Sequence, residues 1–159
     1  MEPLEVGPAS ADELQSPLRL LEAELREGEP LPEEFVRALA AAVRAGDADV
    51  LDAREAVSEG PTESVGAALV YYRLNLASGG RFASFEELHV APGNRGRGVG
   101  RALLAEVERR CAEKGISYIE AQIIAESVSF FISAGYEPEP DLEVLSRSIA
   151  SGSLGAFGF

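Results

Sequence analysis

The apolar residues of the N-terminal third are spaced as in amphipathic helices. Between residues 14 and 25 a leucine recurs every three or four positions, which predicts a helix that ends near Arg26, just before Gly28. The start of this helix has two candidates. One is a capping box that begins at Ser10, and the other is a first turn that contains Pro17, with Ser16 as the cap.

The next segment combines a second helix with three strands. Acidic residues near the start and Gly46 at the end bound a helical pattern that begins at residue 32. Beyond Gly46 the apolar positions alternate with a period of two, as they do in half-buried strands. We expect strands at Asp49–Val57, Val65–Leu76 and Phe82–Val90, and the short turns between them predict an antiparallel meander.

The second half of the chain predicts a strand–helix–strand unit. A glycine-rich loop leads into a helix at Val99–Lys114, capped by Gly115, and Ile116–Ile124 has the pattern of a buried strand. This crossover predicts that the new strand lies parallel to the third strand. A short helix at Glu126–Ala134 and a last strand at Leu142–Ile149 follow. The expected fold class is α/β, with a mixed central sheet (an antiparallel meander plus a parallel β-α-β crossover) flanked by helices.

The composition is that of a single globular domain. The chain has 159 residues, of which 46% are hydrophobic and 26% charged. We assign residues 1–150 to one domain. We assign no structure to the Gly-rich tail, residues 151–159. The chain has one cysteine, Cys111, so we expect no disulfide framework and no cysteine-rich zinc site. It has one histidine, His89, so we expect no histidine-based metal site. The chain has no apolar run of about 20 residues and no basic signal-peptide start, so we expect a cytoplasmic protein.

Negative charge is concentrated near the N-terminus. The formal net charge is −13, to which residues 1–60 contribute −10, residues 61–136 zero and residues 137–159 −3. This balance argues against a basic surface that binds nucleic acid or an anionic membrane. The middle segment nevertheless contains a stretch with three arginines and no acid, residues 88–105. An anionic ligand is therefore expected there.

The acid-free stretch has the pattern of a phosphate-binding loop. Arg95, Gly98 and Gly100 form R-x-x-G-x-G between a predicted strand and a predicted helix. Glycines allow the backbone to turn tightly and to approach a ligand closely. The free N–H groups of a first helical turn bind anions, and Arg97 and Arg101 add positive charge, so phosphate or pyrophosphate is the expected ligand.

The glycine-rich loop has three other possible interpretations. No G-x-x-x-x-G-K-[ST] run is present, which excludes a P-loop. A dinucleotide fingerprint would begin at Gly96 and would use Glu120, but Arg101 occupies the position of its third glycine, and three strands precede the loop where such a domain would begin. The plainest alternative is a glycine-rich turn with exposed arginines.

Two segments resemble the GNAT family of N-acetyltransferases. Arg95–Leu104, preceded by Leu88–Pro92, closely resembles the acyl-CoA signature of that family, and Ser129–Tyr136 is similar to its second motif on the last helix. The order of the predicted elements from residue 4 to residue 149 also agrees with the family's fold. The resemblance implies an acyl-CoA-dependent acyltransferase.

The resemblance also implies where the cofactor lies. Acetyl-CoA, or another acyl-CoA, would bind in the cleft where the strand that ends at Val90 separates from the strand that starts near Ile116. Backbone groups of the first strand would pair with the pantetheine arm, amides of the loop would hold the pyrophosphate, and no metal takes part. The residues assigned to the cofactor in this way are Leu88, His89, Val90, Arg95, Gly96, Arg97, Gly98, Val99, Gly100, Arg101 and Phe131.

In this family the acyl group passes directly from the thioester to an amine, which benefits from a general base. The candidate catalytic residues are Glu86 and Glu120. Strand alternation would place Glu86 with Leu88 on one face of the third strand, and Glu87 with His89 on the other. Glu86 ranks first, because family members that use a strand residue as the base have it on this face. An ordinary, partly solvated carboxylate is the alternative for both acids.

One position departs from the family pattern. The family's usual acid is a tyrosine on the short helix, and the aligned residue here is Phe131. Water or one of Tyr71, Tyr72 and Tyr118 would then have to protonate the leaving thiolate. The same departure supports a second hypothesis, a non-catalytic acyl-CoA-binding or regulatory module. A dinucleotide-binding domain is the third.

The first hypothesis is acetyl transfer to a primary amine of a small cationic molecule or a peptide. In this family the N-terminal helices commonly line the acceptor side, and here the N-terminal third holds most of the acids. An acidic lip would attract a cationic amine. Neither nucleic acid nor a membrane is an expected partner, and the family resemblance leaves a homodimer open.

Overall fold

The computed structural model describes residues 3–56, 59–60 and 62–149. The Gly-rich tail lies outside the described residues. The chain divides into a first unit, Met1–Ala125, and a second unit, Glu126–Phe159, and each is described by itself.

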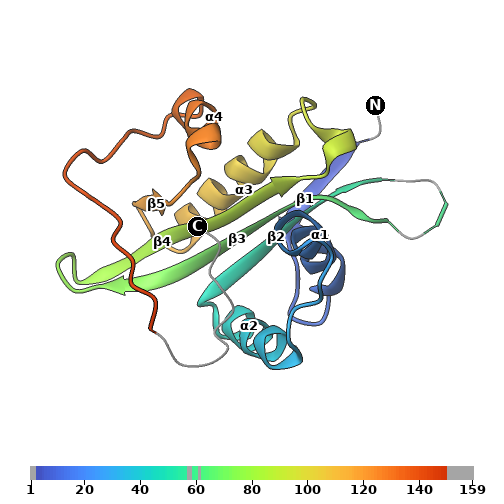
Figure 1. The fold of residues 1–159 in the computed structure, drawn as a ribbon, viewed down its shortest axis with the longest axis horizontal. Coiled ribbons are helices and arrows are strands. Elements are labelled where there is room, and N and C mark those ends of the chain that lie inside the picture. Colours follow the sequence, from blue (N-terminus) through green and yellow to red (C-terminus); the bar gives the residue numbers. More distant parts are fainter. Residues whose placement is uncertain (1–2, 57–58, 61, 150–159) are drawn as a thin grey trace. The chain divides into compact units, whose positions relative to one another are not determined.

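The first unit is built on one mixed sheet with the strand order β1-β2-β3-β4-β5 (Figure 1). Strands β1 to β4 pair with their neighbours in antiparallel fashion, and β5 runs parallel to β4. This arrangement confirms the predicted meander and the predicted parallel crossover. The strands are β1 at Leu4–Pro8, β2 at Ala48–Glu55, β3 at Ser64–Asn75, β4 at Gly80–Val90 and β5 at Ile119–Ala121.

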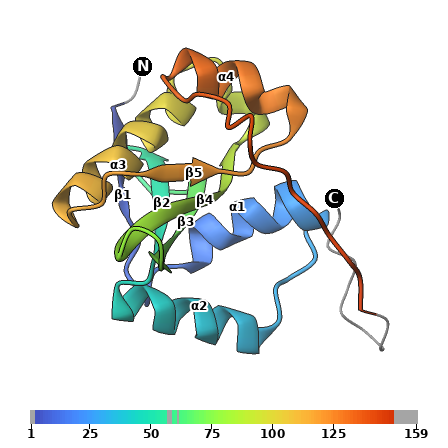
Figure 2. The ribbon, with the colours of Figure 1, turned by 90° about the vertical axis from the view of Figure 1, so that its left-hand side faces the viewer.

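Helices cover both faces of this sheet, with α3 on one face and α1 and α2 on the other (Figure 2). They lie where the apolar periodicity predicts them, and Gly46, with φ of 78°, ends α2 in the left-handed conformation that glycine adopts easily. Pro17 lies in the first turn of α1, as one of the two predicted starts requires. Both predicted caps are wrong, because the N-cap is Leu14, and neither Ser10 nor Ser16 occupies that position. The helices are α1 at Gln15–Arg26, α2 at Glu33–Ala45 and α3 at Val99–Glu113.

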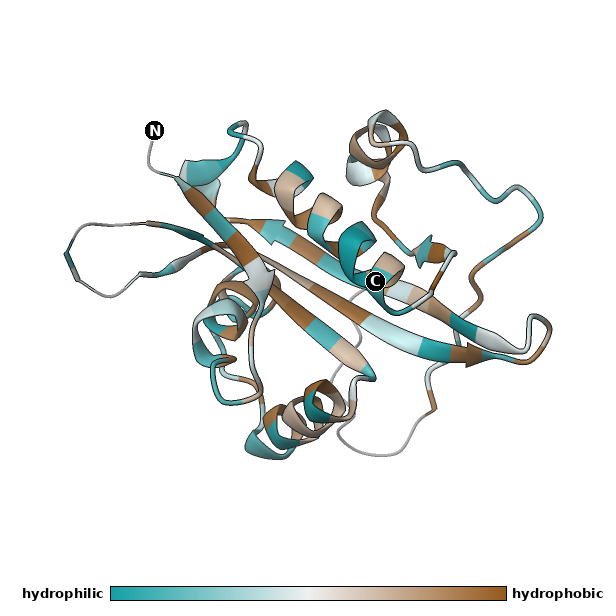
Figure 3. Ribbon diagram, turned by 180° about the vertical axis from the view of Figure 1, so that it is seen from behind, coloured by the Kyte–Doolittle hydropathy of each residue, from teal (hydrophilic) through white to brown (hydrophobic). Residues whose placement is uncertain are grey.

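Hydrophobic side chains fill the space between the sheet and α1 and α2. Leu18, Leu21 and Leu39 of the helices pack with Val50 and Leu69 of the strands. Figure 3 shows hydrophobic and hydrophilic residues interspersed along both the strands and the helices. Burying each such side chain contributes about 1.5–3 kcal/mol, so this packing attaches the helices to the sheet.

The opposite side of the sheet packs closely against α3. Phe85 of β4 is the largest fully buried side chain among the described residues, and Cys111 of α3 is buried, as its apolar neighbours predict. Gly66 of β3 lies directly beneath the start of α3. A Cβ at this position would lie 2.7 Å from Val99 Cγ1 and 3.0 Å from Leu103 Cδ1. The absence of a side chain at Gly66 therefore sets how near α3 comes to the sheet.

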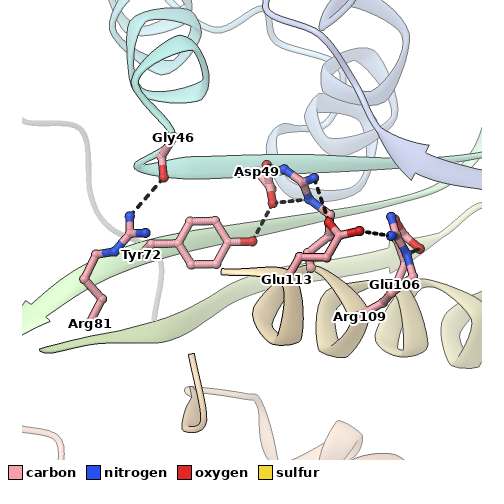
Figure 4. A network of polar contacts seen from close by, with 8 residues as sticks. Gly46, Asp49, Tyr72, Arg81, Glu106, Arg109 and Glu113 are labelled. Carbon is pink, nitrogen blue, oxygen red and sulfur yellow. Dashed lines mark hydrogen bonds and ion pairs between the residues drawn. The ribbon is translucent and has the colours of Figure 1, made fainter. Parts of the chain in front are cut away.

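A buried carboxylate joins the C-terminal half of α3 to the sheet. Asp49 of β2 accepts hydrogen bonds from Arg110 Nε at 2.9 Å and from Arg110 Nη2 at 3.0 Å. Tyr72 Oη donates to the same carboxylate, and Arg109 pairs with acids on the exposed side of the helix (Figure 4). Burial and the bond to Asp49 raise the pKa of Tyr72 far above its usual range. The buried charge of Asp49 is thus fully matched by a guanidinium and a hydroxyl.

Two strand predictions are wrong. Residues 142–149 form no strand, because apolar alternation needs a partner strand, and the described part of the second unit contains none. The strand predicted at Ile116–Ile124 is limited to three residues, and Ile124 is 65% exposed. It is short because it pairs with β4 only at Ala83–Phe85.

The first strand of the sheet is not predicted by the apolar pattern. β1 has five residues, ends in Gly7-Pro8 and lies at the edge of the sheet, where it pairs only with β2. Glycine and proline are depleted in strands, and an edge position tolerates both. Tertiary pairing with β2 therefore decides its conformation.

The close approach of α3 to β3 can be tested at Gly66. Gly66→Ala should lower the free energy of unfolding by about 1–3 kcal/mol, because the stiff Val99 side chain must move. Gly7→Ala is the matched control, since Gly7 is also a strand glycine and a Cβ there meets no heavy atom within 4 Å. Its effect should stay within about 1 kcal/mol. Equal losses in urea denaturation would show that α3 is not held closely at Gly66.

The ion pair between Asp49 and Arg110 can be tested in the same way. Asp49→Asn should lower the free energy of unfolding by about 3 kcal/mol, because it leaves the Arg110 guanidinium without its counter-charge. Tyr72→Phe removes a single hydrogen bond and should cost about 1 kcal/mol. If urea denaturation gave the two variants the same loss, the charge of Asp49 would contribute nothing beyond a hydrogen bond.

Candidate functional site

β4 and β5 pair over a short distance and then part. The parallel pairing covers Ala83–Phe85 of β4 and Ile119–Ala121 of β5. Beyond this point β4 continues to Val90, and within the described first unit it pairs there with β3 alone. One edge of residues 86–89 therefore offers backbone N–H and C=O groups to an extended ligand. The carbonyl of Val90 already accepts a hydrogen bond from Arg95 Nε at 3.1 Å.

A β-bulge interrupts β4 where the two strands part. Val70 of β3 lies opposite Phe85, but the preceding Leu69 lies opposite Glu87, so Glu86 is an extra residue in β4. Leu69 belongs to the core beneath α1 and α2. Because residues opposite each other in an antiparallel pair share a face, Glu87 also points to the side of α1 and α2.

The predicted alternation along β4 is therefore wrong beyond Phe85. The inserted residue shifts the pattern by one, so Glu86 and Glu87 share a face, whereas Leu88 turns to the side of α3. His89 lies on the face of Glu87, and its Nε2 is 2.8 Å from Glu87 Oε2. His89, which the family resemblance assigns to the cofactor, thus has Glu87 as its carboxylate partner. The prediction that these two residues share a face is correct.

Both candidate bases lie on this face. Ser84 Oγ donates a hydrogen bond to Glu86 Oε1 at 2.7 Å, and Ser84 also lies opposite Glu120 in the parallel pair. Tyr71 of β3 lies opposite Ser84, and its pKa is raised by burial and by the negative charge of Glu86. Glu86, Tyr71 and Asp47 line a depression of about 580 Å³. No motif in the sequence marks Asp47 as a residue of this site.

The loop between β4 and α3 has the backbone geometry of an anion-binding loop. Gly96 and Gly98 have φ of 74° and 84°, and Gly98 caps α3. The N–H of Ala102 bonds to Gly98 O at 3.0 Å, so the amides of residues 99–101 lie before the first bond of the helix. A Cβ at Gly96 or Gly98 would meet no heavy atom within 4 Å. This open space beside the amides fits a phosphate group.

Arg95 and Arg97 of the loop pair with acids from distant parts of the first unit. Arg95 Nη2 is 3.0 Å from Glu24 Oε2 of α1, and Arg97 Nη1 is 2.7 Å from Glu55 Oε1 at the end of β2. Arg101 lies in the first turn of α3. The loop contains no acid, so no local sequence signal reveals these pairs. Tertiary contacts supply the counter-charges.

The second predicted motif lies in the second unit. Its helix α4 spans Val128–Ser133 and follows a 3₁₀ turn at Ala125–Ser127, close to the predicted range. Phe131 packs edge-on against Phe130 and Tyr136, with ring centroids 5.4 Å and 5.2 Å away. A phenyl ring has no proton to give, so Phe131 cannot be the acid. Its assignment to the cofactor stays a prediction.

The tyrosines considered as substitute acids differ in position. Tyr72 donates its hydroxyl to Asp49 on the α3 side of the sheet. Tyr71 lies on the side of the two candidate bases, and so does Tyr118, whose ring centroid is 6.5 Å from that of Phe82. Of the three tyrosines, Tyr71 and Tyr118 therefore share a face with Glu86 and Glu120, and Tyr72 does not.

Other kinds of site have no support in the described residues. Among these residues no three His, Cys, Asp or Glu side chains are grouped so that they could hold a metal ion. None of the described helices is both long and apolar enough to cross a membrane. Burial and the negative charge of Asp49 raise the pKa of the Cys111 thiol, which disfavours a thiolate nucleophile.

Comparison with known proteins adds a family match. The sequence model of the acetyltransferase (GNAT) family matches residues 18–136. No curated protein sequence matches the chain significantly. Among solved structures, an acetyltransferase from Trypanosoma brucei is similar, with a TM-score of 0.73 and 22% identity over 91% of this chain and 100% of that chain.

Two further solved structures share the fold. An aminoglycoside acetyltransferase from an uncultured soil metagenomic sample, in complex with sisomicin, has a TM-score of 0.75 and 19% identity over 92% of this chain and 97% of that chain. A predicted acetyltransferase with acetyl-CoA from Clostridium acetobutylicum has a TM-score of 0.72 and 14% identity over 91% and 96%. The family match covers most of the chain and agrees with the mixed sheet and its flanking helices, so the chain belongs to the acetyltransferase (GNAT) family.

Proposed function

We propose that this protein transfers an acetyl group from acetyl-CoA directly to the primary amine of a small cationic molecule or a peptide. The observation that carries the proposal is the position of Glu86 at the bulge where β4 leaves β5. The free edge of β4 and the glycine loop follow the bulge along the chain. A ligand that extends from the loop along this edge would bring its acyl end to Glu86.

The proposed cofactor is supported by the loop and by the comparisons. Amides of residues 99–101 would hold the pyrophosphate, and the open space beside Gly96 and Gly98 leaves room for it. Backbone groups of Leu88 and its neighbours would pair with the pantetheine arm. The structure from Clostridium acetobutylicum, which shares the fold, contains acetyl-CoA. Acetyl-CoA would supply the activated thioester carbonyl.

In the proposed reaction Glu86 takes a proton from the ammonium group of the acceptor, directly or through water, and leaves a neutral amine. The bond from Ser84 Oγ holds the carboxylate in place. The amine nitrogen forms a C–N bond to the thioester carbon, and the C–S bond breaks as the CoA thiolate leaves. The nitrogen loses its second proton and the thiolate gains one, so one proton is released overall.

The departure at Phe131 bears on the last proton transfer. With no tyrosine at this position, water, Tyr71 or Tyr118 would protonate the thiolate. The same observation favours the second hypothesis, in which the protein binds an acyl-CoA without turnover. Measuring CoA release over a panel of amines separates the two, because a binding module releases no CoA.

The proposed acceptor is an amine because of the carboxylates around the site and the relatives of the same fold. Glu86 and Glu120 supply negative charge on one side of the first unit. The metagenomic protein that shares the fold is an aminoglycoside acetyltransferase in complex with sisomicin. A positively charged amine is thus the acceptor that both observations support.

The cofactor loop can be tested at Gly98. Gly98→Asp should weaken acetyl-CoA binding by about tenfold or more, because a carboxylate would occupy the space meant for the pyrophosphate. Gly28→Asp is the matched control, since Gly28 has φ of 85° and a Cβ there also meets no heavy atom within 4 Å. Both should lose about 1 kcal/mol of folding free energy. An unchanged Kd for Gly98→Asp in calorimetry would contradict the assigned loop.

The candidate base can be tested at Glu86. Glu86→Gln should lower kcat by about 10²–10⁴-fold and leave the Kd of acetyl-CoA nearly unchanged. Glu87→Gln is the matched control, because Glu87 lies on the same strand and face but bonds to His89. Glu120→Gln tests the second candidate. A large loss in Glu120→Gln alone would transfer the role to Glu120, and a loss in none of them would contradict a carboxylate base.

A further inference from the structure

The sheet of the first unit has an aromatic surface next to the two candidate bases. Tyr71 lies opposite Ser84, and two residues further along the same strands Arg73 lies opposite Phe82. The ring of Tyr118 lies beside that of Phe82, at a centroid distance of 6.5 Å. We call this surface the aromatic face, and it consists of Tyr71, Arg73, Phe82, Glu86, Tyr118 and Glu120.

These side chains share one side of the sheet. Phe82, Ser84 and Glu86 alternate along β4 with the buried Ala83 and Phe85. Glu120 lies opposite Ser84 in the parallel pair. Tyr118 is 44% exposed, so a large aromatic ring remains open to solvent. An exposed ring beside a depression and two carboxylates has the composition of a small-molecule site.

We propose that the aromatic face binds the acceptor and selects a primary amine that has one positive charge and a flat apolar group. This inference rests on the proposed function, because the amine must reach Glu86. Glu86 and Glu120 attract the ammonium group at one end of the face. The rings of Tyr71, Phe82 and Tyr118 supply surface on which a flat group stacks.

The outer part of the face lacks the negative charge that would attract a second ammonium group. Arg73 lies at the far end from Glu86, and Asp47, which lines the same depression, offsets its charge. This leaves the outer part without net negative charge. Polyamines and aminoglycosides, which carry several charges, are therefore poorer acceptors than an amine with a single charge and an aromatic ring.

Three amines test this selectivity, with CoA release as the measurement. 2-Phenylethylamine has one charge and a ring, butylamine has one charge and no ring, and 1,4-diaminobutane has two charges. We expect kcat/KM for 2-phenylethylamine to exceed the other two by about tenfold or more. A higher value for 1,4-diaminobutane or for sisomicin would overturn the inference and leave the proposed function intact.

A binding measurement separates this inference from the proposed function. Calorimetry of 2-phenylethylamine with the CoA-saturated protein reports the aromatic face without any turnover. Binding without acetylation of any amine would refute the proposed function and support the face as a site. Acetylation of amines with no preference for the ring would support the proposed function and refute the aromatic face as a selective site.

Variants of the aromatic face test the role of its rings and of its cation. Tyr118→Leu should lower the ratio of kcat/KM for 2-phenylethylamine over butylamine by about fivefold. Phe35→Leu is the matched control, because Phe35 is an aromatic residue of α2 with a similar exposure, 41% against 44%. Arg73→Gln should raise kcat/KM for 1,4-diaminobutane alone. Equal effects of Tyr118→Leu on both monoamines would overturn the proposed stacking.

Discussion

The single residue inserted into β4 is the constraint on which the whole site depends. A strand that kept its alternation would pair along all of its length with β3 and would turn Glu87 away from Glu86. The parallel pairing with β5 ends at Phe85, directly before the insertion, so the edge of β4 beyond it has no partner strand among the described residues of the first unit. The same residue brings its own carboxylate to the point of separation. The unpaired edge of β4 and the candidate base Glu86 thus have one structural cause.

Helix α3 is fixed at both ends, and this holds the loop before it in position. At its start the bare backbone of Gly66 lets Val99 and Leu103 approach the sheet closely. Near its end Arg110 forms the ion pair with the buried Asp49. A helix held at two points has little freedom to tilt, so the amides of its first turn keep a constant direction. Residues that touch no ligand thereby orient the groups that would bind the phosphates.

The sequence predicts the features whose cause is local and misses those whose cause is tertiary. Helix α2 follows from its own periodicity and from Gly46, and the loop follows from the backbone freedom that Gly98 provides. The bulge is missed by strict alternation, although it leaves a mark on residues 84–90. Only with an inserted residue do Phe85, Leu88 and Val90 share one face of β4 while the polar residues of this segment share the other. The pair between Arg95 and Glu24 joins residues 71 positions apart. This pair is not visible in the sequence without the packed helix.

The charges of the loop and of the N-terminal third have to be considered together. The excess of acids gives a net charge of −13, and two of these acids, Glu24 and Glu55, already neutralise Arg95 and Arg97. A pyrophosphate bound as proposed would therefore exchange partners with these carboxylates instead of meeting free arginines. Since partly exposed pairs contribute about 0–1 kcal/mol each, this exchange gains or loses little. The decisive contribution to anion binding then comes from the backbone amides beside Gly98, whose direction the fold fixes before any ligand arrives.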